Sequence, residues 1–379
     1  MLALELVFWA AACLLVYTHF GYPLVLRLLV GLRGERPATT AEPDEGDLPA
    51  VSLLIAAHDE AGVIEARVAD ARRLDYPAGR LQVIIASDGS ADRTVELAER
   101  AGADVVLDLP RAGKVAALNA AAEVAHGDVL AFSDANTTWE PYALRRLVAR
   151  FAEPDVGYVC GAVRFDAPDG DNQEGVYWRY EMAVRALESR LAGITAGNGA
   201  INAVRREAYV FLPPGRGQDV CFPFLAVKAG WRPVYEPAAR AREPMAATIG
   251  DERERKRRMM SGAWATMLGG GMLSPRGYGP LYAFEIVSHR LLRYSTPLLH
   301  LVALAANIAL LGEGWVYAAT LAVQALVLVA AGLGGWFPAR PLRIARYYVA
   351  VTAASAAGLW DHLRRRVPKT WEQAGGTRQ

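Results

Sequence analysis

The chain has 379 residues, a formal net charge of +1 and 53% hydrophobic residues. This near-neutral balance argues against a general nucleic-acid-binding protein, because phosphate backbones require a strongly basic surface. The three cysteines are far apart and lack CxxC spacing, so the sequence predicts neither a disulfide framework nor a zinc site.

Apolar residues run almost without interruption from Leu2 to Val30, which is long enough to span a bilayer. A signal peptide is the alternative, but it needs a basic start, and here the positive charges lie at or beyond the far end of the run. Positive flanks stay in the cytoplasm, so we expect a retained transmembrane helix over 1–33 with its N-terminus outside. A linker containing proline and acidic residues follows at 34–50.

From Val51 onward, short β-branched runs alternate with longer helical patterns. This alternation predicts an α/β domain over 51–245, built on a mostly parallel sheet with flanking helices. Strands are expected at 51–55, 83–86 and 129–132, and helices at 61–73 and 92–101.

Acidic residues follow three of the predicted strands, namely Glu60, Asp88 and Asp134. In open α/β sheets, ligands bind beyond the carboxyl ends of the strands, so this pattern indicates a site for a metal-bound nucleotide. Carboxylates at Glu60 and Asp88 can accept hydrogen bonds from a base N–H or from ribose hydroxyls. Asp88 also lies in an Asp-Gly-Ser sequence, for which a simple turn is equally good an explanation.

Two further features suit a diphosphate and its metal. Asp134 and Asn136 have the i, i+2 spacing that points two oxygen ligands the same way on an extended segment, and oxygen ligands suit Mg²⁺ or Mn²⁺. Lys114 begins a predicted helix, where an ammonium group and the helix dipole favour phosphate oxygens. The surrounding sequence is not a Walker A loop, and a solvated lysine remains the alternative.

Asp219 lies at the start of another predicted helix. It could be the N-cap of that helix, or a general base that accepts a proton from an attacking hydroxyl. Upstream, Gly197 to Ala200 is expected to be a flexible turn that enters a helix near 204–207.

The last third of the chain predicts a membrane-associated region. A charged run that includes Arg255 and Arg258 lies near the start of region 246–283. We expect this region to lie at the membrane interface, with its basic side chains facing lipid phosphates or the acceptor. A solvated helix face is the alternative. Region 284–379 contains three apolar stretches. We expect two spans and a re-entrant third segment, with a full crossing as its alternative, at 294–311, 315–336 and 347–360.

Taken in order, these motifs resemble membrane-bound family 2 glycosyltransferases with a GT-A fold, the cellulose- and hyaluronan-synthase-like group. The matching segments are the strand end Ala57–Glu60, Ser87–Ser90 for Asp-Asp-Gly-Ser, Gly113–Asn119 for Gly-Lys-x-x-Ala-Leu-Asn, Asp134–Asn136 for DxD, Gln218–Asp219 for the catalytic pair, and Gly230–Pro237 for the strand that follows.

The resemblance implies an inverting transferase that uses a nucleotide-sugar, typically a UDP-sugar, with Mn²⁺ or Mg²⁺. Asp219 would be the base, and the metal would stabilise the leaving diphosphate. It also implies an integral protein of the plasma membrane, with a cytoplasmic catalytic domain that contacts membrane lipids. The donor would bind at Glu60, Asp88, Lys114, Asn119 and Asp134, and the metal at Asp134 and Asn136.

The chain departs from the family pattern at Ser87, Asn136 and Gln218, each of which replaces an acid, and it lacks the synthases' Gln-x-x-Arg-Trp. We therefore expect transfer of a single sugar to a lipid-linked or other glycan acceptor rather than extrusion of a polymer. A non-catalytic subunit of a polysaccharide assembly complex is the main alternative. A sugar nucleotidyltransferase fits less well because it would not explain the apolar segments.

Overall fold

The structure is a computed structural model that describes residues 1–34, 44–166, 173–244, 249–337 and 339–364. Most of the predicted linker, residues 35–43, lies outside the described residues. So do the predicted boundary at 245–246 and the basic residues Arg365 and Arg366.

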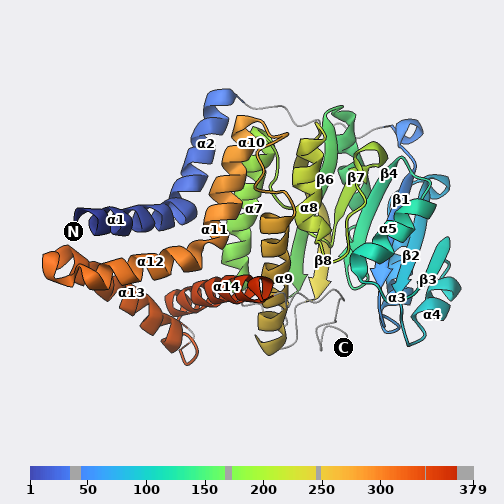
Figure 1. The fold of residues 1–379 in the computed structure, drawn as a ribbon. Helices are drawn as coiled ribbons and strands as arrows, with labels where there is room; N and C mark the ends of the chain where they lie inside the picture. Colours follow the sequence, from blue (N-terminus) through green and yellow to red (C-terminus); the bar gives the residue numbers. More distant parts are fainter. Residues whose placement is uncertain (35–43, 167–172, 245–248, 338, 365–379) are drawn as a thin grey trace.

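One half of the molecule is built on a mixed eight-stranded sheet in the order β3-β2-β1-β4-β7-β6-β8-β5 (Figure 1). Strands β1 to β4 pair in parallel, β7 is antiparallel to both of its neighbours, and β6 pairs in parallel with β8. The predicted α/β sheet is therefore confirmed. The strands are β1 (Val51–Ala57), β2 (Leu81–Asp88), β3 (Val105–Leu109), β4 (Val129–Asp134), β5 (Thr138–Trp139), β6 (Val156–Asp166), β7 (Asn202–Arg205) and β8 (Arg232–Pro244).

The register aligns the carboxyl ends of three strands. Ala57 on β1 pairs with Ser87 on β2, and Ala56 pairs with Asp134 on β4. The acidic residues that follow these strands therefore lie at one edge of the sheet, as the sequence predicted.

Helices cover both faces of this sheet. Side chains alternate between faces along a strand, so Leu53 and Ile55 pack under α3, α4 and α6, whereas Leu54 and Ala56 pack under α5 and α8. The result is a three-layer arrangement with a core on each face. The helices are α3 (Ile64–Arg72), α4 (Thr94–Arg100), α5 (Lys114–Val124), α6 (Ala143–Ala149) and α8 (Gln218–Lys228), with short 3₁₀ turns η2 (Glu45–Asp47), η3 (Ala78–Arg80), η4 (Arg150–Ala152) and η5 (Arg206–Ala208).

The remaining helices lie on the side of the molecule away from β1 to β4 (Figure 1). They are α1 (Leu2–Val16), η1 (Tyr17–Gly21), α2 (Tyr22–Arg33), α7 (Gln173–Leu191), α9 (Ile249–Gly269), α10 (Pro280–Glu285), η6 (Ile286–Leu291), α11 (Leu292–Tyr294), α12 (Thr296–Ala309), η7 (Leu311–Glu313), α13 (Trp315–Leu333) and α14 (Arg340–Leu363).

The N-terminal helix bends sharply between α1 and α2 (Figure 1). The bend coincides with the π-helical turn η1 and with Pro23, which has no backbone N–H to donate into that turn. Leu26 and Val30 of α2 pack against Val184 and Leu191 of α7, while α1 lies beside α12. The predicted single helix is thus two helices with different neighbours.

Among the described residues, two helical segments are long and apolar enough to cross a membrane, Leu2–Arg33 and Trp315–Leu333, and α12 is apolar but shorter. Large apolar side chains such as Leu326 remain exposed on α13. Helix α14 is longer than predicted and packs along α9, where Trp264 Nε1 donates to the Ser355 carbonyl at 3.0 Å.

Candidate functional site

The turn after β1 is fixed against the loop after β2. Asp59 adopts a positive φ of 51°, its N–H donates to Ser90 Oγ at 3.0 Å, and its carboxylate accepts from the Ala91 N–H at 2.7 Å. The next residue, Glu60, donates its N–H to Thr94 Oγ1 at 2.8 Å and is only 5% exposed. These bonds place the predicted donor ligand Glu60 at the carboxyl edge of the sheet.

The Asp88 carboxylate holds the loop that begins α5. Its Oδ1 accepts from the N–H groups of Ala112 and Gly113 at 2.7 and 2.9 Å, and its Oδ2 accepts from Gly113 at 3.0 Å. The following Gly89 has a φ of 64°, and a Cβ there would lie 2.8 Å from the backbone nitrogen of Arg111. The predicted contact of Asp88 with base or ribose stays a prediction, while its role in the loop is a finding.

Lys114, the first residue of α5, forms an ion pair with Asp134 at the end of β4. Both side chains are 23% exposed. Burial lowers the pKa of Lys114, but the carboxylate of Asp134, helped by Asp219 and Glu243, outweighs burial and leaves that pKa raised. The ammonium group therefore stays charged at the edge where the sequence predicts a diphosphate.

Asp134 and Asn136 supply a carboxylate and an amide oxygen to this edge, and both side chains are partly exposed. Within the described parts of the chain, no group of three or more His, Cys, Asp or Glu side chains comes together to hold a metal. Two oxygen donors nevertheless suit Mg²⁺ or Mn²⁺, which commonly complete their coordination with substrate phosphates and water. The donor set therefore fits the predicted metal, and the Lys114 ammonium shows that Asp134 attracts a cation.

Asp219 lies in the first turn of α8, where Gly217 is the N-cap and makes no side-chain capping bond. A Cβ at position 217 would lie 2.6 Å from Asp219 Oδ1, so glycine leaves room for this carboxylate orientation. Burial raises the pKa of Asp219, the charge of Lys114 lowers it, and Asp134 raises it further, leaving it above its usual value. A carboxylate with a raised pKa is a better proton acceptor, as a general base requires.

The loop before β7 connects these groups. The Gly197 N–H donates to the Asp219 carbonyl at 2.7 Å, and a Cβ at Gly199 would lie 3.3 Å from Lys114 Nζ and 3.5 Å from Asp134 Oδ2. The predicted helix near 204–207 is wrong at its start, because Asn202–Arg205 is strand β7, whereas Arg206–Ala208 forms the short 3₁₀ turn η5. This strand lies between β4 and β6, which satisfy its backbone groups from both sides.

The other predicted site residues have structural contacts. Asn119 donates from Nδ2 to the Leu212 carbonyl and accepts from the Tyr209 hydroxyl, both at 2.8 Å, so it ties α5 to the segment after β7. Arg255 and Arg258 are partly buried on α9. The predicted contacts of Asn119 with the donor, and of the two arginines with acceptor or lipid, stay predictions.

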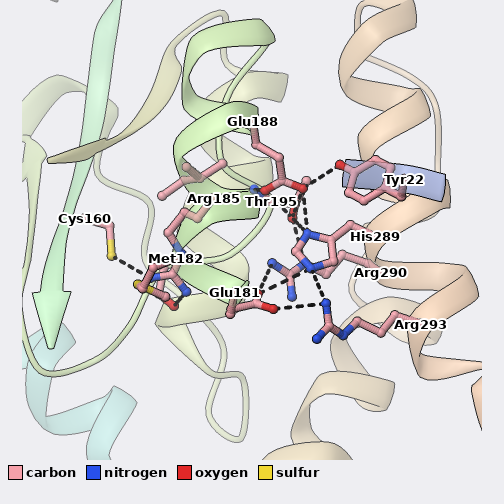
Figure 2. A network of polar contacts seen from close by, with 12 residues as sticks. Tyr22, Cys160, Glu181, Met182, Arg185, Glu188, Thr195, His289, Arg290 and Arg293 are labelled. Atoms are coloured by element: carbon pink, nitrogen blue, oxygen red, sulfur yellow. Dashed lines mark hydrogen bonds and ion pairs between the residues drawn. The ribbon is translucent and has the colours of Figure 1, made fainter. Parts of the chain in front are cut away.

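A buried polar network between α7 and η6 was missed by the sequence reasoning (Figure 2). Its carboxylates are Glu181 and Glu188, and its basic side chains are His289, Arg290 and Arg293. The available signal was two acids seven residues apart, Glu181 and Glu188, a spacing that places both side chains on one face of a helix.

Part of the α/β domain is similar to a known protein family. Residues 52–210 match glycosyl transferase family 2. An N-acetylglucosaminyltransferase of Rhizobium meliloti (strain 1021) is 28% identical over 67% of this chain and 65% of its own length. A beta-monoglucosyldiacylglycerol synthase of Trichormus variabilis is 30% identical over 55% of this chain and 46% of its own length. The chain thus spans less than two thirds of the length of these curated relatives.

Among solved structures, the mannosyltransferase PcManGT from Pyrobaculum calidifontis, in complex with GDP-Man and Mn²⁺, superposes with a TM-score of 0.72. The superposition covers 95% of this chain and 99% of that one at 22% identity. It confirms the predicted GT-A-type fold.

Proposed function

We propose that the protein transfers one sugar from a nucleotide-sugar to a membrane-associated acceptor, because residues 52–210 match glycosyl transferase family 2. The supporting observation is that Lys114 and Asp134 form an ion pair at the carboxyl edge of the sheet. The loop that carries Gly199 beside this pair also donates the Gly197 N–H to the Asp219 carbonyl. A proton acceptor, a cation for the diphosphate and oxygen ligands for a metal are the groups that such a transfer needs.

In the proposed reaction the acceptor hydroxyl oxygen attacks C1 of the sugar and displaces the nucleoside diphosphate, with inversion at C1. Asp219 accepts the hydroxyl proton as the new C–O bond forms, because its raised pKa favours proton uptake. Lys114 binds the diphosphate, where its charge interacts with the phosphate oxygens. When bound, a divalent metal would be held by Asp134 and Asn136 and would neutralise charge on the leaving diphosphate.

The acceptor side of the proposal rests on the apolar helices and on the relatives. Helix α13 exposes Leu326 and Leu328, which favours insertion in a bilayer. The beta-monoglucosyldiacylglycerol synthase is named for a lipid product. We propose that this chain likewise uses a lipid-linked or glycan acceptor. We place the catalytic domain in the cytoplasm at the plasma membrane, with Arg255 and Arg258 near lipid phosphates. Retention in alkaline-washed membranes tests insertion; release into the wash would contradict it.

The function is tested with detergent-purified protein and a panel of UDP- and GDP-sugars, with Mn²⁺ or Mg²⁺ and a lipid acceptor extract. The expected result is release of nucleoside diphosphate from one donor and a labelled product. Asp219→Asn should abolish both while the protein keeps its melting temperature. Full turnover in that variant would show that Asp219 is not the base. Full activity in excess EDTA would show that the reaction does not need a divalent metal.

The second candidate is a non-catalytic subunit, which the replacements at Ser87, Asn136 and Gln218 favour. Thermal stability with UDP or GDP and Mn²⁺, combined with the turnover assay above, separates the two. A ligand present at 100 to 1,000 times its Kd stabilises the folded state by about 3–4 kcal/mol, which shifts the melting temperature measurably. Binding without turnover on any donor and acceptor would favour the subunit.

A further inference from the structure

Glu188 on α7 is the centre of the buried network in Figure 2. Its carboxylate is fully buried and accepts hydrogen bonds from the Tyr22 hydroxyl at 2.7 Å and from His289 Nδ1 at 2.6 Å. It also accepts from the hydroxyl and the backbone N–H of Thr195, at 3.1 and 3.2 Å. Four donors from three separate parts of the chain thus converge on one carboxylate.

The charges of the network are balanced by two arginines. Arg290 Nε donates to Thr195 Oγ1 at 2.8 Å, and Arg293 lies 3.1 Å from Glu181. Burial alone would raise the pKa of Glu181, but Arg293, His289 and Arg290 together hold it well below its usual value. Such a buried network is destabilised strongly when one partner is removed, so its geometry is well fixed.

Thr195 is also part of a backbone segment, residues 194–199, that we call the strap. At its start, the Ile194 carbonyl accepts from the Tyr282 hydroxyl at 3.1 Å. Further along, the Gly197 N–H donates to the Asp219 carbonyl at 2.7 Å, while the Gly197 carbonyl accepts from Arg185 at 3.1 Å. The strap therefore connects the buried network to the backbone of the proposed base.

The strap has little room to move at its centre and at its end. A Cβ at Gly197 would lie 2.0 Å from the Tyr158 hydroxyl, and a Cβ at Gly199 would lie 3.3 Å from Lys114 Nζ. Thr195 is only two residues from Gly197, about 7 Å in an extended chain. In so closely packed a segment, a displacement of Thr195 should also move Gly197 and the Asp219 backbone that it contacts.

We propose that Thr195 is a positioning residue for sugar transfer: held by Arg290 and Glu188, it fixes the strap and thereby the position of Asp219. This inference rests on the proposed function. It assigns the helices around η6 a role in the reaction itself, because the side chain of Arg290 sets the position of Thr195.

The kinetic test compares Thr195→Val and Thr195→Ser with Tyr22→Phe, which is the matched control because it removes one hydrogen bond from the same Glu188 carboxylate without touching the strap. Thr195→Val should lower kcat roughly 10- to 100-fold with donor KM changed by less than about 3-fold, since small misplacements at a reacting centre have effects of this size. Thr195→Ser should restore kcat, and Tyr22→Phe should leave it unchanged. Equal kcat values for Thr195→Val and Tyr22→Phe would overturn the proposal.

Hydrogen exchange of backbone amides provides a readout that is independent of activity. In Thr195→Val, and in Thr195→Ala if the valine variant does not fold, the amides of 195–199 and 218–221 should exchange at least about 10-fold faster, whereas Tyr22→Phe should not change them. Unchanged exchange in these segments would reject the positioning role. If the wild-type protein transfers no sugar, the proposed function fails, and the exchange data still decide whether Thr195 orders the backbone of Asp219.

Discussion

Asp88 binds the backbone N–H of Gly113 with both of its carboxylate oxygens, at 2.9 and 3.0 Å. The contact joins the end of β2 to the start of α5, because Asp88 is the last residue of β2 and Gly113 precedes the helix that begins with Lys114. A residue chosen from the sequence as a donor ligand thus acts, in this structure, on the loop before Lys114, the lysine that we propose binds the diphosphate.

Asp88→Asn should therefore weaken both stability and nucleotide binding. The amide offers only one oxygen to the two N–H groups of the loop, which should cost about 1–3 kcal/mol of unfolding free energy. Denaturant unfolding and calorimetric titration with nucleoside diphosphate measure the two effects. Asp108→Asn, at an exposed position on β3, is the control and should change neither. A native-like affinity in Asp88→Asn would separate the loop from the donor site.

Lys114→Gln should reduce affinity for the donor diphosphate. A hydrogen bond to a charged group contributes about 1.5–3 kcal/mol, so the dissociation constant should rise roughly 10- to 100-fold. Lys256→Gln, on α9, should leave it unchanged and controls for the loss of one positive charge. Binding of nucleoside diphosphate with Mn²⁺ is the measurement, and equal affinities in the two variants would place the diphosphate elsewhere.

The pH dependence of kcat/KM should report Asp219. Burial raises its pKa above the usual 3.8 and the positive charge of Lys114 only partly opposes this, so the base becomes protonated at a higher pH than an ordinary aspartate. Activity should be present above this raised pKa and lost as the pH falls through it. Removing the charge of Lys114 should move the acidic limb to still higher pH. An acidic limb at or below 3.8 would contradict the assignment.

Glu181→Gln should destabilise the fold by roughly 3–5 kcal/mol, because it leaves Arg293 buried near a neutral partner. The exposed pair of Glu65 and Arg100 is the comparison, and Glu65→Gln should change stability by less than about 1 kcal/mol. The pKa of Glu181 is lower in the folded state than its usual 4.5. Its contribution is therefore complete above that pH and lost as the pH falls through the lowered value, so the wild type and Glu181→Gln should converge in stability in strong acid.

Gly358→Ala should disrupt the contact between α9 and α14. A Cβ at Gly358 would lie 2.7 Å from the Met260 backbone, so the helices must separate. Gly332→Ala on α13 is the matched control, since a Cβ there meets nothing within 4 Å and alanine favours the helix. We expect a lower melting temperature for the first variant and an equal or higher one for the second. A higher melting temperature for Gly358→Ala would show that the contact is not close-packed.

The sequence alone predicted the α/β sheet, and it placed Glu60, Asp88 and Asp134 after strands that end at one edge. These features follow from local chemistry, because short β-branched runs between turn residues form strands and carboxylates after parallel strands share an edge. The sequence failed at residues 204 and 205, the start of the helix predicted near 204–207, which belong to strand β7. Whether that short run forms a strand depends on its neighbours β4 and β6, which are distant in sequence.

Only the tertiary structure decided which groups the side chains contact. Asp88 could be assigned to the loop before Lys114 only once the ends of β2 and α5 were placed together, and the strap from Thr195 to Asp219 depends on residues as far apart as Glu188 and Arg290. Residue type and periodicity specify elements because they act over a few residues. Hydrogen bonds between distant residues depend on how those elements pack, which local pattern does not encode.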